Sequence, residues 1–200
     1  MIIDTLNDVL DSIWQRWTRG KADRRSPLHT PVVGSVDCYG ATQQRIMVLR
    51  GVDRLSRTMR FHTDRRSSKA LQIGDGAPLS VLGYDATAKI QMRISGTAHI
   101  ETVGPTADTA WASSTPSSRR IYLVTPGPGT AVEAPRSGLP KDMEHRVPSL
   151  EESESGRGNF AVLVVTIHHI EWLYLASEGH QRAAFSCGGE GIWSGKWLIP

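Results

Sequence analysis

Hydroxyl and cationic side chains are concentrated in one short segment, Thr63-Asp64-Arg65-Arg66-Ser67-Ser68-Lys69. The segment lies where a β-like run passes into a short helical run. Free backbone N–H groups and the positive dipole at the start of a helix suit a phosphate, and guanidinium and ammonium groups donate strong hydrogen bonds to it. This junction is therefore the best candidate for an anion site, although the same residue types also suit a solvated basic turn.

A second basic segment, Arg45-Ile46-Met47-Val48-Leu49-Arg50, has a cation at each end. Arg45 and Arg50 are five positions apart on a predicted strand, so they should face opposite sides of it. One of them could serve a ligand phosphate while the other serves a different group.

Three more residues combine a polar or aromatic group with a strand position: Gln91, Trp172 and Arg182. Gln91 shares one face of an alternating run, residues 88–96, with Arg93 and Ser95. Its amide could pair with the edge of a heteroaromatic ring. By residue type alone each has an ordinary alternative, because a strand Trp is usually core and polar residues on strands are usually solvated.

Several familiar site types are missing from the sequence. It has no Gly-x-Gly-x-x-Gly turn, no phosphate-binding Gly-x-x-x-x-Gly-Lys-Ser/Thr loop and no Gly-x-Ser-x-Gly nucleophile elbow. His168 and His169 are adjacent on a predicted strand and should point to opposite faces, so joint metal ligation is not expected. We predict no metal site, and the catalytic side chains stay unknown.

The elements that position these residues begin with a predicted amphipathic helix that packs on the core. Asp4 is a possible N-cap of this helix and Gly20 a possible stop. Its apolar residues recur at helical spacing: Leu6, Val9, Leu10, Ile13, Trp14 and Trp17. A basic, Pro-containing linker follows, so residues 1–30 are assigned to an N-terminal helix and linker.

From residue 32 onwards, short β-rich runs alternate with turn residues at hairpin-like distances, which indicates antiparallel pairing in a barrel or sandwich. The predicted strands are Val32–Tyr39, Gln44–Val52, Thr58–His62, Pro78–Tyr84, Ala88–Val103, Asn159–Leu175, Gln181–Ser186 and Ile192–Ile199. Short helices are predicted over Arg66–Ile73 and Thr106–Ser114, and residues 126–158 form a Pro/Gly-rich loop. The fold class is therefore mainly β with flanking helices, with residues 31–200 as one domain.

Bulk properties fit one domain in a reducing compartment. The chain has 200 residues, a net charge of +3 and two cysteines, Cys38 and Cys187, which cannot build a disulfide framework. The longest apolar run, residues 160–167, is too short to cross a bilayer. We expect a cytoplasmic protein with no membrane partner, and so mild a charge does not favour nucleic-acid binding.

Taken in order, these segments resemble the pyridoxamine 5′-phosphate oxidase-like, FMN-binding split-barrel family, over roughly Pro31 to Pro200. Residues 45–50 resemble the family's Arg-x-Val-Leu-x-Lys/Arg strand, and residues 61–69 its Phe-Tyr-Thr-Asp-x-x-Arg-Ser-x-Lys stretch. Trp172 and Arg182 are ten positions apart, like the family's flavin-contacting Trp and Arg. The end of the chain, residues 197–200, resembles the family's usual Arg-Leu-x-Pro finish.

The resemblance implies an antiparallel split β-barrel that binds FMN, in a homodimer with FMN at the subunit interface. It implies that the phosphate is held by cations of the two basic segments and that Gln91, Trp172 and Arg182 lie near the flavin ring. The expected cofactor-binding residues are Arg45, Met47, Val48, Leu49, Arg50, His62, Thr63, Arg66, Ser67, Lys69, Gln91, Trp172 and Arg182.

The residues that hold the substrate in the family's pyridoxamine-phosphate oxidases are not matched. Glu178 and His180 stand where these enzymes have an Arg-x-His pair, and a glutamate would repel a phosphate. Of the family's substrate-phosphate cradle only the proline survives within residues 111–119, although Arg119 and Arg120 could supply charge differently. The family's Gln-Ser flavin contact has no counterpart at residues 124–128.

We therefore interpret the chain as an FMN-dependent oxidoreductase whose substrate and electron donor are unknown, and not as a pyridoxamine-phosphate oxidase. A different class stays open, namely an FMN-binding module without turnover that acts as an electron carrier, store or sensor. A related barrel that binds the deazaflavin F420 or haem is a third alternative, and nucleic-acid binding a distant fourth.

Overall fold

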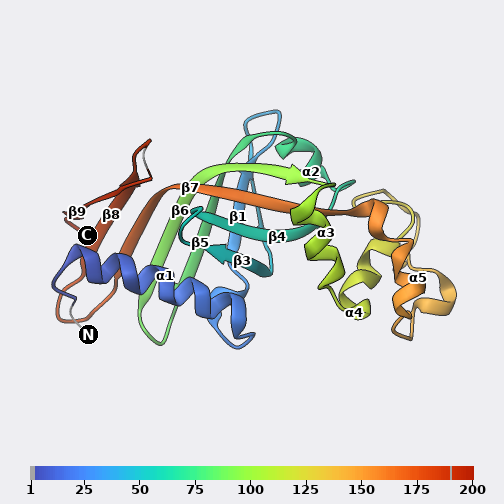
Figure 1. The fold of residues 1–200 in the computed structure, drawn as a ribbon, viewed down its shortest axis with the longest axis horizontal. Helices are drawn as coiled ribbons and strands as arrows, with labels where there is room; N and C mark the ends of the chain where they lie inside the picture. Colours follow the sequence, from blue (N-terminus) through green and yellow to red (C-terminus); the bar gives the residue numbers. More distant parts are fainter. Residues whose placement is uncertain (1–2, 190) are drawn as a thin grey trace.

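The computed structural model describes residues 3–189 and 191–200, and its centre is an antiparallel sheet that curls around a hydrophobic core (Figure 1). The strands are β1 (Val32–Val36), β2 (Thr42–Ile46), β3 (Leu49–Asp53), β4 (Thr58–Asp64), β5 (Ala77–Asp85), β6 (Ile90–Glu101), β7 (Phe160–Tyr174), β8 (Gln181–Cys187) and β9 (Trp193–Leu198). They pair in the order β2-β1-β5-β6-β7-β4-β3, with β8 also pairing β7 and β9 pairing β8. The expected mainly antiparallel β fold with flanking helices is confirmed.

Strand β7 joins the two parts of the sheet. Its first half pairs with β4 and its second half with β8, while β6 runs along its whole length. The register shifts at Ser95/Gly96, and a Cβ at Gly96 would lie 2.0 Å from the carbonyl oxygen of Thr166. Only glycine allows the two backbones to approach this closely, so Gly96 permits the irregularity at which the long strands bend.

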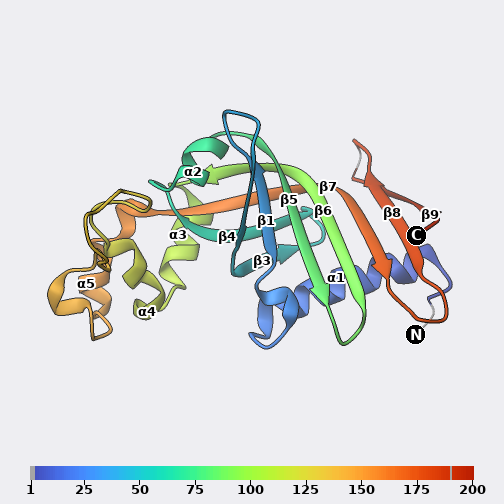
Figure 2. The same ribbon diagram turned by 180° about the vertical axis from the view of Figure 1, so that it is seen from behind.

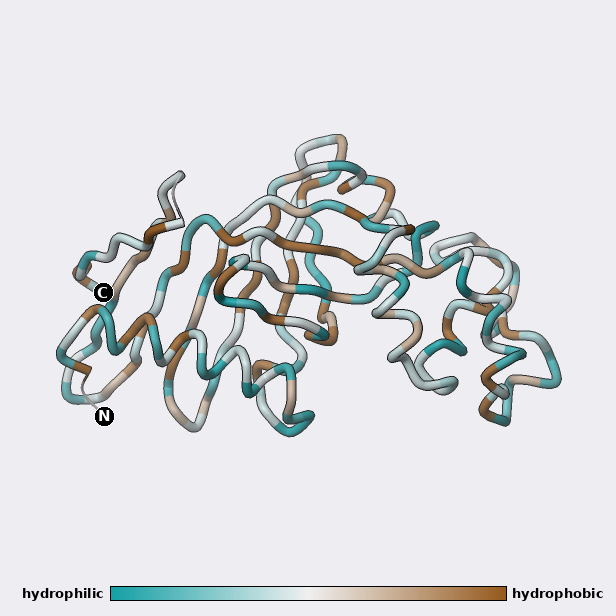
Figure 3. Tube along the Cα trace, viewed as in Figure 1, coloured by the Kyte–Doolittle hydropathy of each residue, from teal (hydrophilic) through white to brown (hydrophobic). Residues whose placement is uncertain are grey.

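Helix α1 (Leu6–Ala22) lies across the sheet from β3 to β8 and β9 (Figures 1 and 2). Thr5 caps it by accepting a hydrogen bond from the backbone N–H of Asp8, so the N-cap is Thr5 and not Asp4. Trp17 is fully buried in the main core, and Trp14 is 3% exposed. The hydropathy colouring shows hydrophobic and hydrophilic residues alternating along α1 (Figure 3).

A second, smaller layer of helices caps the other end of the sheet (Figure 1). It contains α3 (Pro105–Ala112), α4 (Pro116–Arg119), α5 (Leu150–Glu154) and 3-10 turns at Arg120–Leu123, Lys141–Met143 and Arg157–Asn159. Helix α2 (Ser68–Ile73) follows β4 and lies against β1, β5 and β6, and a further 3-10 turn, Pro27–His29, follows α1. Trp111 and Tyr122 pack edge-on against each other and against Phe160 at the start of β7. This aromatic cluster fixes the chain on both sides of the long loop.

Two expectations about local structure are corrected. The predicted strand Gln44–Val52 is broken at residues 47–48, because β2 pairs with β1 while β3 pairs with β4. The loop predicted over residues 126–158 contains α5, whose start is a capping box between Ser149 and Glu152. Of the helices in the described ranges, none is both long and apolar enough to span a membrane.

Candidate functional site

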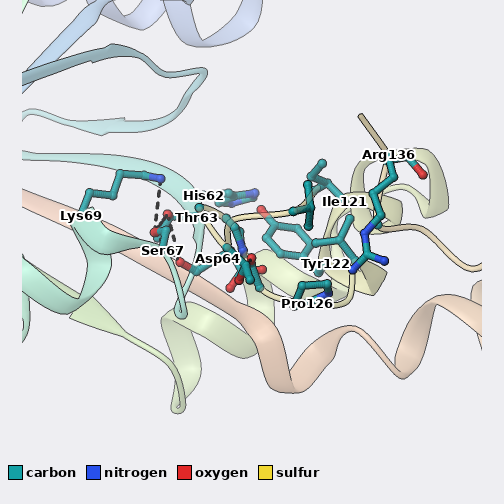
Figure 4. A pocket seen from close by; sticks show the side chains of 17 residues that line it. His62, Thr63, Asp64, Ser67, Lys69, Ile121, Tyr122, Pro126 and Arg136 are labelled. Atoms are coloured by element: carbon teal, nitrogen blue, oxygen red, sulfur yellow. Dashed lines mark hydrogen bonds between the residues drawn. The ribbon is translucent and has the colours of Figure 1, made fainter. Parts of the chain in front are cut away.

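A cavity of about 470 Å³ lies between the end of β4, the start of α2 and the loop of residues 121–138. Its first wall contains His62, Thr63, Asp64, Ser67 and Lys69. Its second wall is built from residues 121–138 (Figure 4). A volume of this size is within the range of cofactor pockets.

The turn from β4 into α2 brings hydroxyl groups together at the cavity floor. Thr63 and Ser67 are 3% and 6% exposed, and their hydroxyl oxygens are 3.3 Å apart. The Ser67 backbone N–H and hydroxyl both donate to the carbonyl of Asp64, at 3.1 and 2.7 Å, which fixes the turn. The short helix α2 then begins directly after Ser67.

One cation stands beside these hydroxyls, and the charge of a second acts on it. The Lys69 ammonium donates to the Ser67 hydroxyl at 3.3 Å (Figure 4). Burial lowers the pKa of Lys69, and the positive charge of Arg45 lowers it further, which places Arg45 close by. Arg45 donates through Nη1 to the Ser35 hydroxyl at 2.7 Å, so β1 holds its guanidinium in position. Two desolvated cations that repel each other form a site that an anion would stabilise.

Arg66 has a structural position that sequence reasoning missed. Its Nε and Nη2 donate to the two carboxylate oxygens of Asp64 at 3.0 and 2.6 Å, and Nη2 also donates to the carbonyl of Val124 at 3.1 Å. Arg66 does not line the cavity. In this structure its guanidinium neutralises Asp64 and ties the turn to the opposite wall, and its binding to a ligand phosphate stays a prediction.

His62 and Tyr122 supply the aromatic surface of the cavity (Figure 4). The His62 ring packs edge-on against Phe160 at 4.9 Å between centroids. Burial and the charges of Arg50 and Arg60 lower the pKa of His62 to about 4, so it is neutral at pH 7. Burial raises the pKa of Tyr122, which keeps its hydroxyl protonated. The cavity thus presents two neutral aromatic groups beside a cationic end.

The second wall could not be assigned a role from sequence. It includes the Pro126-Gly127-Pro128-Gly129 run, followed by Arg136, Ser137 and Gly138. The Thr125 N–H donates to the Gly138 carbonyl at 2.7 Å, which closes the loop on itself. Arg136 lies at the end of the labelled group opposite Lys69 (Figure 4). In the sequence, only the high content of Pro and Gly indicated a long loop here.

The residues of the basic segment 45–50 lie in different parts of the structure around the cavity. Met47 and Leu49 are 7% and 0% exposed and belong to the main core, so only their backbone groups are left to face a ligand. Val48 lies between them and is half-buried. Arg50 is exposed on β3 and lines a neighbouring cavity that shares His62 with the first. Arg45 lies on β2 and Arg50 on β3, so the two cations are not on opposite faces of one strand, and their binding to a ligand stays a prediction.

Gln91 and Arg182 lie together in a separate small cavity of about 110 Å³ on the sheet. In the register of β6, β7 and β8, Leu173 lies between them. The Arg182 guanidinium is 2.6 Å from a carboxylate oxygen of Glu171, and the other carboxylate oxygen is 2.6 Å from Arg93. Within one chain, these residues do not line the cavity beside Lys69.

The expectation that Trp172 contacts a ligand is corrected. Its side chain is fully buried in the main core and stacks on Tyr174, with ring centroids 6.2 Å apart. Successive residues of a strand point to opposite faces. The residue on the face of Gln91 and Arg182 is thus Leu173, one position later in the chain.

The two arginines considered as replacement charges for a substrate are also engaged elsewhere. Arg119 is 2% exposed, donates to the Trp111 carbonyl at 2.8 Å and pairs with Glu154. Arg120 donates to the carbonyl of Glu144. Both hold the helical layer together, so neither supplies charge to an open site.

The residues beside Lys69 fit FMN. The Lys69 ammonium, beside the Thr63 and Ser67 hydroxyls, offers N–H donors and positive charge to a phosphate dianion, and Arg45 adds positive charge near Lys69. The Asp64 carboxylate, which lines the same cavity, is neutralised by Arg66. The aromatic and proline surfaces of the same cavity suit an apolar ring system.

Comparisons with known proteins agree with this geometry. Residues 12–102 match the model of a family described as pyridoxamine 5′-phosphate oxidase, FMN-binding domain. No protein with a curated description matches the chain significantly.

Solved structures with low sequence identity share the fold. A pyridoxamine 5′-phosphate oxidase-related, FMN-binding protein from Nostoc punctiforme is 20% identical, with 95% of this chain and 96% of that chain covered and a TM-score of 0.70. PhzG from Burkholderia lata, in complex with tetrahydrophenazine-1-carboxylic acid, is 17% identical, with 96% and 92% covered and a TM-score of 0.68. These likenesses confirm the expected split-barrel fold.

Proposed function

We propose, from the match of residues 12–102 to the family model described as pyridoxamine 5′-phosphate oxidase, FMN-binding domain, that this chain is a member of that family, binds FMN and acts as an FMN-dependent oxidoreductase. The observation that supports this proposal most is the end of the cavity at which hydroxyl and cationic groups suited to a phosphate come together. Lys69 stands there beside the Thr63 and Ser67 hydroxyls, and the charge of Arg45, which does not line the cavity, acts on the Lys69 ammonium.

In the proposed complex, Lys69, Ser67 and Thr63 hold the FMN phosphate and Arg45 adds charge from β2. His62 and Tyr122 contact the organic part of the cofactor, with Pro126 and its neighbours as the opposite wall. Bound FMN supplies the electron-transfer chemistry, while the protein supplies position and electrostatics. No side chain of the cavity needs to act as a general base at neutral pH, and His62 is neutral there.

We further propose a homodimer with FMN at its interface. The proposal rests on the family resemblance and on the position of Gln91, Leu173 and Arg182 in a cavity of their own, on a sheet face with exposed apolar side chains. A partner chain can bring such a face against the Lys69 cavity. Leu82 and Tyr84 are 38% and 47% exposed on this face. Light scattering should give a dimer, and L82R with Y84R should shift it to monomer and weaken FMN binding.

A passive flavin carrier or sensor is the alternative function, and turnover separates the two. We propose that bound FMN is reduced by NADH, NADPH or an organic substrate and reoxidised by oxygen. Stopped-flow absorbance at the flavin bands measures both half-reactions. Reduction and reoxidation within seconds support an oxidoreductase, whereas bound FMN that no donor reduces supports the carrier.

A cytoplasmic location is proposed from the sequence alone and is tested by fractionation.

The cofactor itself is tested by the purified protein. We expect flavin absorbance that survives desalting, and FMN as the cofactor released on denaturation and identified by mass spectrometry. A colourless protein that takes up no added FMN contradicts the proposal, and a bound deazaflavin or haem would replace it.

A further inference from the structure

The cavity proposed to hold FMN has a cation at each end. Lys69 stands beside the Ser67 hydroxyl at one end, and Arg136 lies at the opposite end of the labelled group (Figure 4). Among the described lining residues, the other side chain that is charged at pH 7 is Asp64, and Arg66 neutralises it. The cavity therefore keeps positive charge at both of its ends.

Arg136 has no partner for its charge. In the part of the chain that the structure describes, its guanidinium makes neither an ion pair nor a hydrogen bond. By contrast, Arg146, later in the same region, pairs with both Asp142 and Glu152. An unpaired guanidinium on a cavity wall has all its N–H donors and its charge available to a ligand.

The backbone that follows Arg136 is fixed. The Ser137 hydroxyl donates to Glu144 Oε1 at 2.6 Å, and the Thr125 N–H donates to the Gly138 carbonyl at 2.7 Å. Gly138 has a φ of 73°, which favours glycine, and a Cβ there would lie 3.4 Å from the Thr125 carbonyl oxygen. These contacts keep Arg136 at the cavity wall although its side chain is exposed.

The other arginine expected near the flavin ring, Arg182, is already engaged. Its Nη2 lies 2.6 Å from Glu171 Oε2, and the second oxygen of this carboxylate lies 2.6 Å from Arg93. Within one chain, Arg182 does not line the cavity that contains Lys69. The unpaired cation at the end of that cavity opposite Lys69 is Arg136.

We propose that Arg136 supplies positive charge to the ring end of bound FMN and thereby stabilises the reduced form of the cofactor. This inference deepens the proposed function and rests on it. The phosphate and the ring are at opposite ends of FMN, so a cofactor whose phosphate binds at Lys69 extends toward Arg136.

The charge of the ring changes when FMN is reduced. A hydride donor is oxidised as it gives the ring two electrons and one proton, and the ring then carries one negative charge. A cation near this charge favours the reduced form. The pKa of His62 is about 4 and burial raises the pKa of Tyr122, so both side chains are neutral at pH 7. Arg136 is thus the side chain of the aromatic end that can offset the charge.

The test compares the affinities of the apo protein for oxidised and reduced FMN. Calorimetry gives the affinity for oxidised FMN, and anaerobic reduction of the loaded protein beside a redox dye gives the reduction potential of the bound cofactor. Arg136→Gln should bind oxidised FMN within about twofold of the wild type and reduced FMN about 5- to 10-fold more weakly, because water partly screens an exposed charge. A tenfold difference lowers the two-electron potential by about 30 mV.

Two further variants separate charge from structure. Arg136→Lys keeps the charge and should retain most of the wild-type potential. Lys141→Gln is the matched control, because it removes one positive charge from an exposed residue nearby in the chain that does not line the cavity. Its potential should equal that of the wild type. The effect of Arg136→Gln should also decrease at high salt, since salt screens exposed charges.

A potential that Arg136→Gln leaves unchanged would overturn the inference, while FMN binding and the proposed cofactor would stand. Equal losses of affinity for oxidised and reduced FMN would overturn it too, because Arg136 would then act on binding alone. A chain that takes up no FMN overturns the proposed function, and the inference fails with it.

Discussion

Arg66 and Asp64 form an ion pair with two contacts, Nε to Oδ1 at 3.0 Å and Nη2 to Oδ2 at 2.6 Å. The Asp64 side chain is only 7% exposed. The same Nη2 reaches the carbonyl of Val124 at 3.1 Å. The pair thus keeps a carboxylate neutralised at the floor of the candidate cofactor cavity and links the loop of residues 121–138 to the turn that follows β4.

Replacing Arg66 by Ala should destabilise the protein by about 1–3 kcal/mol, because the buried Asp64 carboxylate is left without its guanidinium partner. Urea unfolding measures the loss. Combining Arg66→Ala with Asp64→Asn should recover part of it, since the uncompensated charge is then gone. If Arg66→Ala leaves stability unchanged and abolishes FMN binding alone, Arg66 is a ligand contact and its structural assignment is wrong.

Replacing Lys69 by Ala should weaken FMN binding by about 10-fold or more, because a charge-assisted contact to the phosphate is lost. Riboflavin lacks the phosphate, so its affinity should not change. Arg65→Ala is the control, because Arg65 is exposed in the same turn and does not line the cavity. Equal losses for FMN and riboflavin would mean that Lys69 acts through the fold.

His62 should make the protein less stable in mild acid. Its pKa falls from 6.5 to about 4 on folding, so the unfolded chain takes up the proton first as the pH decreases. The free energy of unfolding should therefore decline between about pH 6.5 and pH 4, and this contribution should level off below that range. His62→Phe should remove about 1–3 kcal/mol of the decline, allowing for the partial exposure of the ring.

Urea unfolding at a series of pH values measures this difference. His180→Phe is the control, because His180 is exposed. A His62→Phe variant whose stability declines as steeply as that of the wild type would show that His62 has an ordinary pKa.

The Trp172 side chain should be essential for the stability of the protein and should have little effect on its affinity for FMN. Trp172→Ala should cost about 3–5 kcal/mol, because it opens a cavity in the core. Trp172→Phe should fold and bind FMN within about twofold of the wild type. Fluorescence quenching of FMN measures the affinity. Weakened FMN binding in a Trp172→Phe variant of normal stability would contradict the position of this side chain.

The fold class could be predicted from the sequence because the apolar alternation in the strands is regular. The break at residues 47–48 could not, because it depends on which partner each half of the segment pairs with. The alternation of residues along β7 also indicates that the Trp172 side chain faces the core. Ile170 and Trp172 lie on the core face of the strand, while Glu171 and Leu173 lie on the opposite face. The ten-residue spacing between Trp172 and Arg182 does not take into account which face each side chain occupies.

The cofactor site was only partly predictable. Thr63, Ser67 and Lys69 are close in sequence, so residue types were enough to find them. Arg66 has the same chemistry as a phosphate ligand, and only the structure places its guanidinium on Asp64.

Calorimetry of the apo protein with FMN and with riboflavin tests the central claim most directly, namely that the cavity at Lys69 and Ser67 recognises the FMN phosphate. We predict one FMN per chain and an affinity for riboflavin about 100-fold weaker, since the phosphate contacts are lost. Equal affinities for the two flavins, or no binding of either, would contradict the account.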